Sequence, residues 1–108
     1  MIVNPLFKPF VSGAVAETLQ SVSNEFDAAA QQNTVTESLG RKYHSALAAY
    51  ENALGDCPWS PDSMTIEPTA HDGIMRDKMR EELGRVRHEY SRILNHFGGA
   101  LSLAGDDD

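Results

Sequence analysis

The strongest helical pattern in the chain lies at positions 72–97, which read DGIMRDKMREELGRVRHEYSRILNHF. Its apolar residues recur at steps of four, four, three, four, three and four: Met75, Met79, Leu83, Val86, Tyr90, Ile93 and Phe97. This spacing places them on one narrow stripe of an α-helix. At a rise of 1.5 Å per residue such a helix is roughly 39 Å long. Gly98 and Gly99 follow, so we expect the helix to stop there and residues 98–108 to form a flexible acidic tail.

A second helix is predicted over residues 12–32. Its apolar residues follow steps of four, three and four: Val15, Leu19, Val22 and Phe26. Ser12 precedes the first of them and is a favourable N-cap, because its hydroxyl can accept a bond from an unpaired backbone N–H of the first turn. We therefore expect one side of this helix to be buried.

A third helix is predicted over residues 34–54. Thr34, with Glu37 three residues later, has the spacing of a capping box. The apolar stripe that follows consists of Leu39, Tyr43, Ala46, Tyr50 and Ala53. Residues 31–33 contain neither Pro nor Gly, so the sequence leaves open whether positions 12–54 form two helices or one bent rod.

Three helical segments without any alternating strand pattern predict an all-α protein. Their narrow stripes favour an antiparallel three-helix bundle, or a long helical hairpin whose first arm is bent. The chain has 108 residues, of which 41% are apolar and 23% are charged. This is the size and composition of one globular domain, so we treat residues 1–108 as a single helical domain.

Two apolar segments lie outside the predicted helices. Residues 1–11 form an N-terminal arm stiffened by two prolines, and residues 55–68 form a Pro-rich loop. Each segment has two interpretations: it packs on the bundle and covers the core, or it inserts into a groove on a partner. The second reading follows because preorganised apolar segments and Trp side chains are effective anchors. The candidate partner-binding residues of the two segments are Phe7, Phe10, Trp59, Met64 and Ile66.

Charge is unevenly distributed along the chain. Sixteen acidic residues against nine Lys and Arg leave a net charge of -7, which argues against nucleic acid as a partner. Residues 72–97 nevertheless contain six basic and five acidic side chains. One interpretation is a solvated face with local ion pairs, such as Lys78 with Glu82. The other is a docking face on which Arg80 and Arg87 bind an acidic protein or a second copy of the chain.

The compartment is inferred from apolar runs and cysteine usage. No stretch of eighteen apolar residues is present, so neither a membrane span nor a membrane partner is expected. Pro5 and Pro9 interrupt the apolar start, so residues 1–10 read as part of the mature protein and not as a signal peptide. The lone Cys57 excludes an internal disulfide and fits a cytoplasmic location, which we expect.

No catalytic, cofactor or metal site is predicted. His88 and His96 lie eight residues apart, about 12 Å along a helix, which is too far to ligate one ion directly. Covalent catalysis by Cys57 would need an adjacent base, and its neighbours Pro58 and Trp59 indicate packing instead.

The sequence therefore predicts a small acidic helical protein–protein interaction module. We expect it to act as an adaptor, chaperone or inhibitor by binding another protein, to self-associate into a homo-oligomer, and not to be an enzyme. One alternative is a structural subunit of a larger assembly, such as a secretion apparatus or a virus particle. A further alternative is a minor enzyme that uses Cys57.

Overall fold

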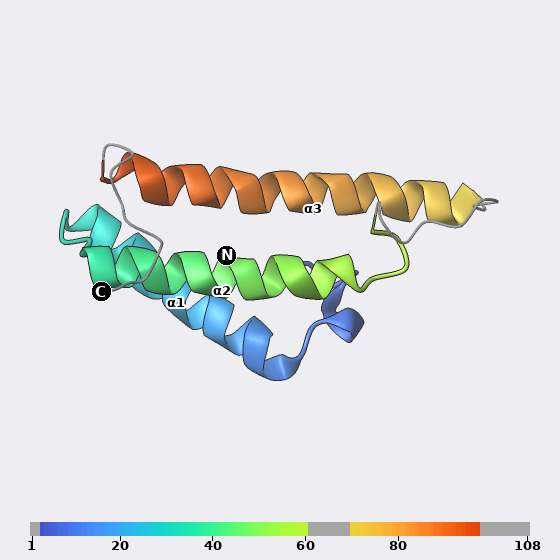
Figure 1. Cartoon of the computed structure of the whole chain (residues 1–108), viewed down its shortest axis with the longest axis horizontal. Coiled ribbons are helices and arrows are strands. Elements are labelled where there is room, and N and C mark those ends of the chain that lie inside the picture. The colour runs from blue at the N-terminus through green and yellow to red at the C-terminus, as the bar shows by residue number, and fades with distance from the viewer. Residues whose placement is uncertain (1–2, 61–69, 98–108) are drawn as a thin grey trace.

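The computed structural model describes residues 3–60 and 70–97, and these residues form an all-α fold, as predicted. A 3₁₀-helical turn, η1 at Lys8–Phe10, is followed by three α-helices: α1 at Gly13–Gln31, α2 at Glu37–Gly55 and α3 at Ala70–Asn95. Consecutive helices run in opposite directions, and α2 lies between the other two (Figure 1). The arrangement is a three-helix bundle. None of its described helices is long and apolar enough to cross a membrane.

The first two helices are separate, because the chain turns sharply between them. Asn33 has a φ of 55°, a left-handed conformation that Asn adopts more readily than most residues. Its backbone N–H donates to the carbonyl of Ala30 at 3.2 Å, and the N–H of Thr34 donates to that of Ala29 at 2.8 Å. These two bonds close the end of α1 in a Schellman motif. The bent-rod alternative for residues 12–54 is therefore wrong.

The start of α2 differs from the predicted position. Ser12 caps α1 as expected, since its side chain accepts from the N–H of Val15 at 3.2 Å. The cap of α2, however, is Thr36, whose side chain accepts from the N–H of Leu39 at 3.1 Å. Thr34 does not cap α2, because its backbone N–H closes the end of α1. Both threonines are good caps in isolation, and the Schellman turn selects the later one.

The third helix is displaced by two residues from the prediction. It covers Ala70–Asn95 where 72–97 was expected, and His96 and Phe97 form a closing turn whose N–H groups bond to carbonyls of the last helical turn. The described part of the predicted loop, residues 55–60, contains the end of α2 and a turn. The rest of that loop, with Met64 and Ile66, and the predicted tail at 98–108 lie outside the described residues.

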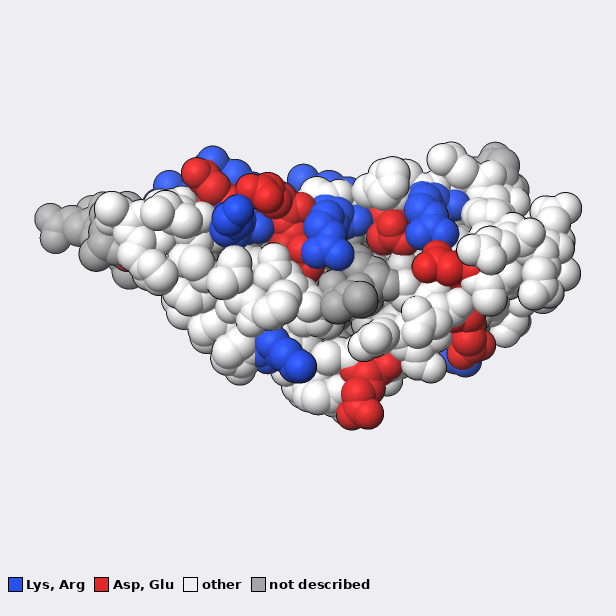
Figure 2. Space-filling model, turned by 180° about the vertical axis from the view of Figure 1, so that it is seen from behind, with Lys and Arg blue, Asp and Glu red and all other residues white. Residues whose placement is uncertain are grey.

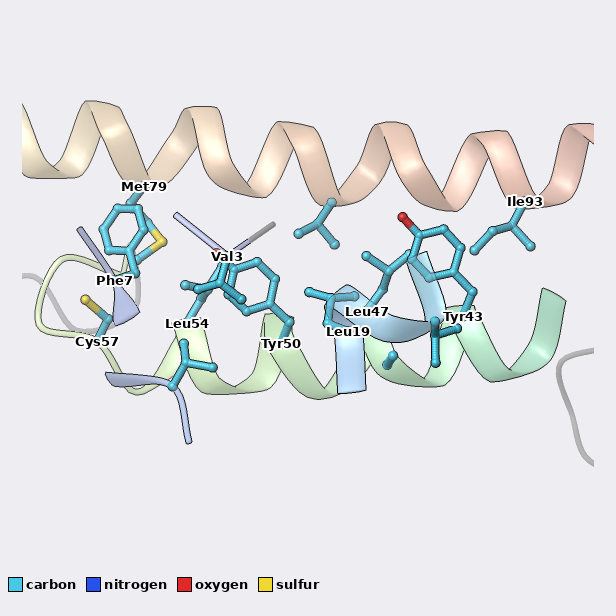
Figure 3. Close-up of a cluster of buried hydrophobic side chains, with 14 of the residues drawn as sticks. Val3, Phe7, Leu19, Tyr43, Leu47, Tyr50, Leu54, Cys57, Met79 and Ile93 are labelled. Atoms are coloured by element: carbon cyan, nitrogen blue, oxygen red, sulfur yellow. The ribbon is translucent and has the colours of Figure 1, made fainter. Parts of the chain in front are cut away.

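The core runs along α2 and receives side chains from both neighbouring helices and from the N-terminal arm. Figure 3 shows Leu47, Tyr50 and Leu54 of α2 between these elements. On α3 the predicted stripe is only partly right, because Leu83 and Tyr90 are half-buried. The fully or nearly buried positions of α3 are Met75, Met79, Glu82, Val86 and Ile93. A carboxylate therefore occupies a core position.

Candidate functional site

Two tyrosines of α2 reach two glutamates of α3 across the helix interface. The hydroxyl of Tyr43 donates to Glu89 Oε1 at 2.6 Å, and that of Tyr50 donates to Glu82 Oε2. In Figure 3 the Tyr43 hydroxyl points from α2 toward α3. The two tyrosines are seven residues, or two helical turns, apart on α2, and the two glutamates are seven residues apart on α3. The two bonds therefore belong to one antiparallel register of the helices. We call this set of bonds the Tyr–Glu ladder.

Each ladder carboxylate also has an arginine one turn further along α3. Arg85 Nη1 lies 2.6 Å from Glu82 Oε1, and Arg92 Nη1 lies 2.7 Å from Glu89 Oε1. Glu82 needs this partner most, because only 1% of its side chain is exposed and an unpaired buried charge is strongly destabilising.

Arg92 also joins the third helix to the first. Its Nη2 lies 2.8 Å from Asp27 Oδ1 on α1, and its guanidinium carbon lies 5.2 Å from the centre of the Phe26 ring. Phe26 meanwhile packs edge-on against His96 with ring centres 5.2 Å apart. These contacts hold α1 and α3 together near their C-terminal ends.

The ladder tyrosines are held in their protonated, donating form. Burial, and then the hydrogen bond to a glutamate, raises the pKa of Tyr43 and of Tyr50 above the ordinary tyrosine value. Tyr90 of α3 bonds in the opposite direction across the interface, donating to Glu51 Oε1 at 3.1 Å. Burial and the nearby Glu51 charge raise the pKa of Tyr90 to about 12. All three phenols therefore act as fixed donors at neutral pH.

The ladder corrects the interpretation of Glu82 as half of a surface pair with Lys78. Glu82 is buried and forms an ion pair with Arg85, three residues later. A signal for this was present in the sequence: Met75, Met79, Glu82, Val86, Glu89 and Ile93 follow steps of four and three without a break. Two glutamates seven residues apart on that stripe match two tyrosines seven residues apart on α2. A stripe defined by apolar residues alone leaves out both glutamates and so does not reveal their match to the two tyrosines.

A groove opens beside the ladder, between α1 and α3. Its volume is about 530 Å³ and its lining comprises Ser23, Asp27, Glu81, Gly84, Arg85, His88, Glu89 and Arg92. The buried Ser23 lies at its floor, 3.3 Å from the Tyr43 hydroxyl. Seen from behind, charged side chains of both signs gather along α3, whereas the surface below them is mainly uncharged (Figure 2). The groove is therefore polar and carries both signs of charge.

The predicted aromatic site residues form a separate cluster at the other end of the bundle. The Trp59 ring lies 6.4 Å from that of Phe7 and 5.5 Å from that of Phe10, and 6.0 Å from that of His71. The indole N–H of Trp59 also donates to Asp72 Oδ1 at 3.1 Å. Because Phe7 is 0% exposed, the arm and the turn pack on the core, which was one of their two interpretations. Phe10, at 37% exposure, keeps an accessible face.

The predicted basic residues lie on the exposed surface of α3. Arg80 has 65% of its side chain exposed and lies 3.5 Å from Asp77. Arg87 is exposed and lines a second groove of about 540 Å³ together with Glu51, Asp56 and Ser60. The structure thus keeps Arg80 and Arg87 on the surface but does not bring them to Phe7, Phe10 or Trp59.

The thiol and the histidines form no assembled site among residues 3–60 and 70–97. Cys57 is 0% exposed, and burial raises the pKa of its thiol against a smaller opposing effect of the Trp59 backbone. A buried thiol of raised pKa is a poor nucleophile. These residues contain no group of three or more His, Cys, Asp or Glu side chains placed to hold a metal ion.

Comparison with known proteins adds no assignment. No family model, no curated protein and no solved structure matches this chain.

Proposed function

We propose that this chain is a non-catalytic protein–protein interaction module that presents the outer side of α3 to another protein. The observation that carries the proposal is the one-sided packing of α3. Its buried residues, Met75, Met79, Glu82, Val86 and Ile93, share one side of the helix by their spacing, while Arg80 and Arg87 are exposed. A 26-residue helix with a charged open side is a suitable surface for a partner.

The ladder supports this proposal because it makes α3 rigid. Tyr43 and Tyr50 tie α3 to α2 at two points separated by two helical turns, and Arg92 ties it to α1. A surface that is already ordered loses less conformational entropy on binding, which favours affinity.

The chemistry of the exposed side favours an acidic protein segment as the partner. Arg80 and Arg87 are seven residues apart and therefore share a face of α3. Arg87 has no ion pair within 3–60 and 70–97, so its guanidinium is available to a partner carboxylate. Arginine is well suited to this, because its planar fork binds a carboxylate through two bonds. We place this interaction in the cytoplasm.

The test is affinity capture from the native source with the tagged full chain, compared with a variant carrying Arg80→Glu and Arg87→Glu. We expect a discrete acidic protein to bind the wild type and to be lost from the variant. Glu17→Lys is the matched control, because Glu17 is exposed on α1, away from α3. Equal helicity by circular dichroism establishes that all three proteins are folded.

Three results would count against the proposal. Capture that is identical for the wild type and the double variant removes α3 as the binding surface. Growth of open-ended oligomers with concentration supports a structural subunit instead. Selective modification of Cys57 in the folded chain at neutral pH supports the enzyme alternative.

A further inference from the structure

We propose that the groove face of α3 binds a second copy of this chain, with the two α3 helices antiparallel about a two-fold axis between Gly84 and Arg85. The inference rests on the proposed function and extends it to a second face of the same helix and to a partner of known sequence. We define the groove face as Asp77, Glu81, Gly84, Arg85, His88 and Arg92. Its members share one side of α3 by helical spacing, and all but Asp77 line the groove.

The charges on this face are arranged as a self-complementary pair of halves. The N-terminal half carries the carboxylates of Asp77 and Glu81, and the C-terminal half carries the guanidinium groups of Arg85 and Arg92 and the imidazole of His88, which is a hydrogen-bond donor. An antiparallel second copy places Glu81 opposite His88 of the second copy. It also places Asp77 opposite Arg92 of the second copy. By symmetry each of these contacts occurs twice.

The alternative orientation is disfavoured by the same charges. A parallel second copy in register would place Glu81 opposite Glu81 and Arg92 opposite Arg92, and like charges across a helix interface are destabilising. Two Arg85 side chains approach the two-fold axis in the antiparallel arrangement. Their charge is already compensated, because each lies 2.6 Å from the buried carboxylate of Glu82 in its own chain.

Gly84 gives an independent reason to place a helix crossing at this point. Glycine in the middle of a helix is less favourable than alanine, so it needs a compensating role. Close packing within the fold does not require glycine here, since a Cβ at Gly84 would meet nothing within 4 Å. A small residue at the crossing point of two helices lets their backbones approach closely. Gly84 lies at the centre of the self-complementary pattern, where the two-fold axis requires the closest approach.

The groove on the α1 side of this face has room for the side chains of the incoming helix. It is open over about 530 Å³, and the exposed Asp27 lies on its α1 rim, 2.8 Å from Arg92. Asp77 forms an ion pair with Arg80 of its own chain at 3.5 Å. In the dimer this pair would lie beside Arg92 and Glu89 of the second copy. The network at that end would therefore alternate in sign.

The test is a charge-exchange series measured by sedimentation equilibrium of the purified full chain. We expect the wild type to dimerise, and Glu81→Arg and His88→Glu each to weaken the dimer about tenfold, because each change acts at two symmetry-related contacts. Mixing these two variants should restore association, because the introduced arginine then faces the introduced glutamate and the other contact keeps its wild-type Glu81 and His88. The variant with both substitutions should likewise regain its homodimer. Glu17→Arg, the same charge change on α1, should leave the dimer unchanged.

Gly84→Gln tests the crossing point, with Gly73→Gln as its matched control. Both glycines lie in α3 and a Cβ at either would meet nothing within 4 Å, so both variants should fold. Only Gly84→Gln should weaken the dimer. A wild-type chain that stays monomeric at all concentrations, or single charge variants whose mixture fails to associate, overturns the inference. If that chain still captures an acidic protein through Arg80 and Arg87, the inference fails while the proposed function stands.

Discussion

The hydroxyl of Tyr50 on α2 donates a hydrogen bond to the carboxylate of Glu82 on α3, whose side chain is 1% exposed. Two turns away Tyr43 makes the same contact with Glu89 at 2.6 Å. A slip of α3 along α2 by one turn would bring an apolar residue to each tyrosine and leave each glutamate without its phenol donor. Buried polar groups without partners are costly, so the ladder selects one register for two helices that apolar packing alone would let slide.

Tyr50→Phe should destabilise the fold by about 1–3 kcal/mol, because it removes a donor from a buried carboxylate. The ring and its packing are retained, so the loss reports the hydroxyl. Urea denaturation followed by circular dichroism measures it. Tyr90→Phe is the control, since Tyr90 is half-buried and its partner Glu51 can turn to water. Equal losses for the two variants would contradict a special role for Glu82.

Phe7→Ala should destabilise the fold by about 3–5 kcal/mol, the usual cost of deleting a fully buried Phe side chain. Phe10→Ala should cost about 1 kcal/mol or less, because Phe10 is 37% exposed and water already reaches part of its ring. Thermal unfolding of both variants, followed through Trp59 fluorescence, makes the comparison. Similar costs would mean that the arm does not hold Phe7 in the core.

Gly84→Ala should stabilise the isolated chain by about 1 kcal/mol, since alanine is the better helix former and a Cβ here would meet nothing within 4 Å. The measurement is the free energy of unfolding at a concentration low enough for the monomer to prevail. Dimerisation should weaken in the same variant. A substitution that stabilises the monomer and weakens the dimer would identify Gly84 as the crossing position. A destabilised monomer would contradict the open space around Gly84.

His44 should make the fold less stable in mild acid. Its ring lies 4.5 Å from that of Tyr90, and burial lowers its pKa below the ordinary value of 6.5, opposed in part by Glu51. The unfolded chain therefore takes up the proton at a higher pH than the folded chain. The stability that comes from keeping His44 neutral is present above pH 6.5 and declines as the pH falls from 6.5 toward the lower pKa of the folded chain.

His44→Phe keeps an aromatic ring against Tyr90 and has no proton to bind. The free energy of unfolding of this variant should fall less between neutral pH and mild acid than that of the wild type. Chemical denaturation at a series of pH values decides this. Parallel curves for the two proteins would assign the acid sensitivity to other groups.

Several features of the fold could be read from the sequence because they are local. The stripes predicted α1, α2 and α3, and Ser12 was identified as the cap of α1, since a cap bonds to an N–H only three residues away. The wrong prediction of Thr34 as the cap of α2 has a local cause as well. Thr34 and Thr36 are equivalent candidates until the turn at Asn33 engages the backbone N–H of Thr34.

The candidate site was harder to predict because its members come from different helices. Arg80 and Arg87 were predicted to bind a partner; the structure places both on the surface of α3, and their binding role stays a prediction. Phe7 was a candidate for partner binding, but whether its ring is exposed depends on where the arm meets Trp59. The ladder was missed because charged residues on a helix are usually solvated, and only a matching donor on another helix makes a buried position favourable.

The spacing of residues along the chain is enough to predict α1, α2 and α3 and their apolar sides, because helical hydrogen bonds and the i to i+4 spacing of side chains involve only near neighbours. The packing of the helices against one another brings Glu82 and Glu89 into the interface, sets one register for α2 and α3, and opens a groove between α1 and α3. These features depend on which side chains of distant segments meet, and a buried charge is stable only where such a partner is supplied.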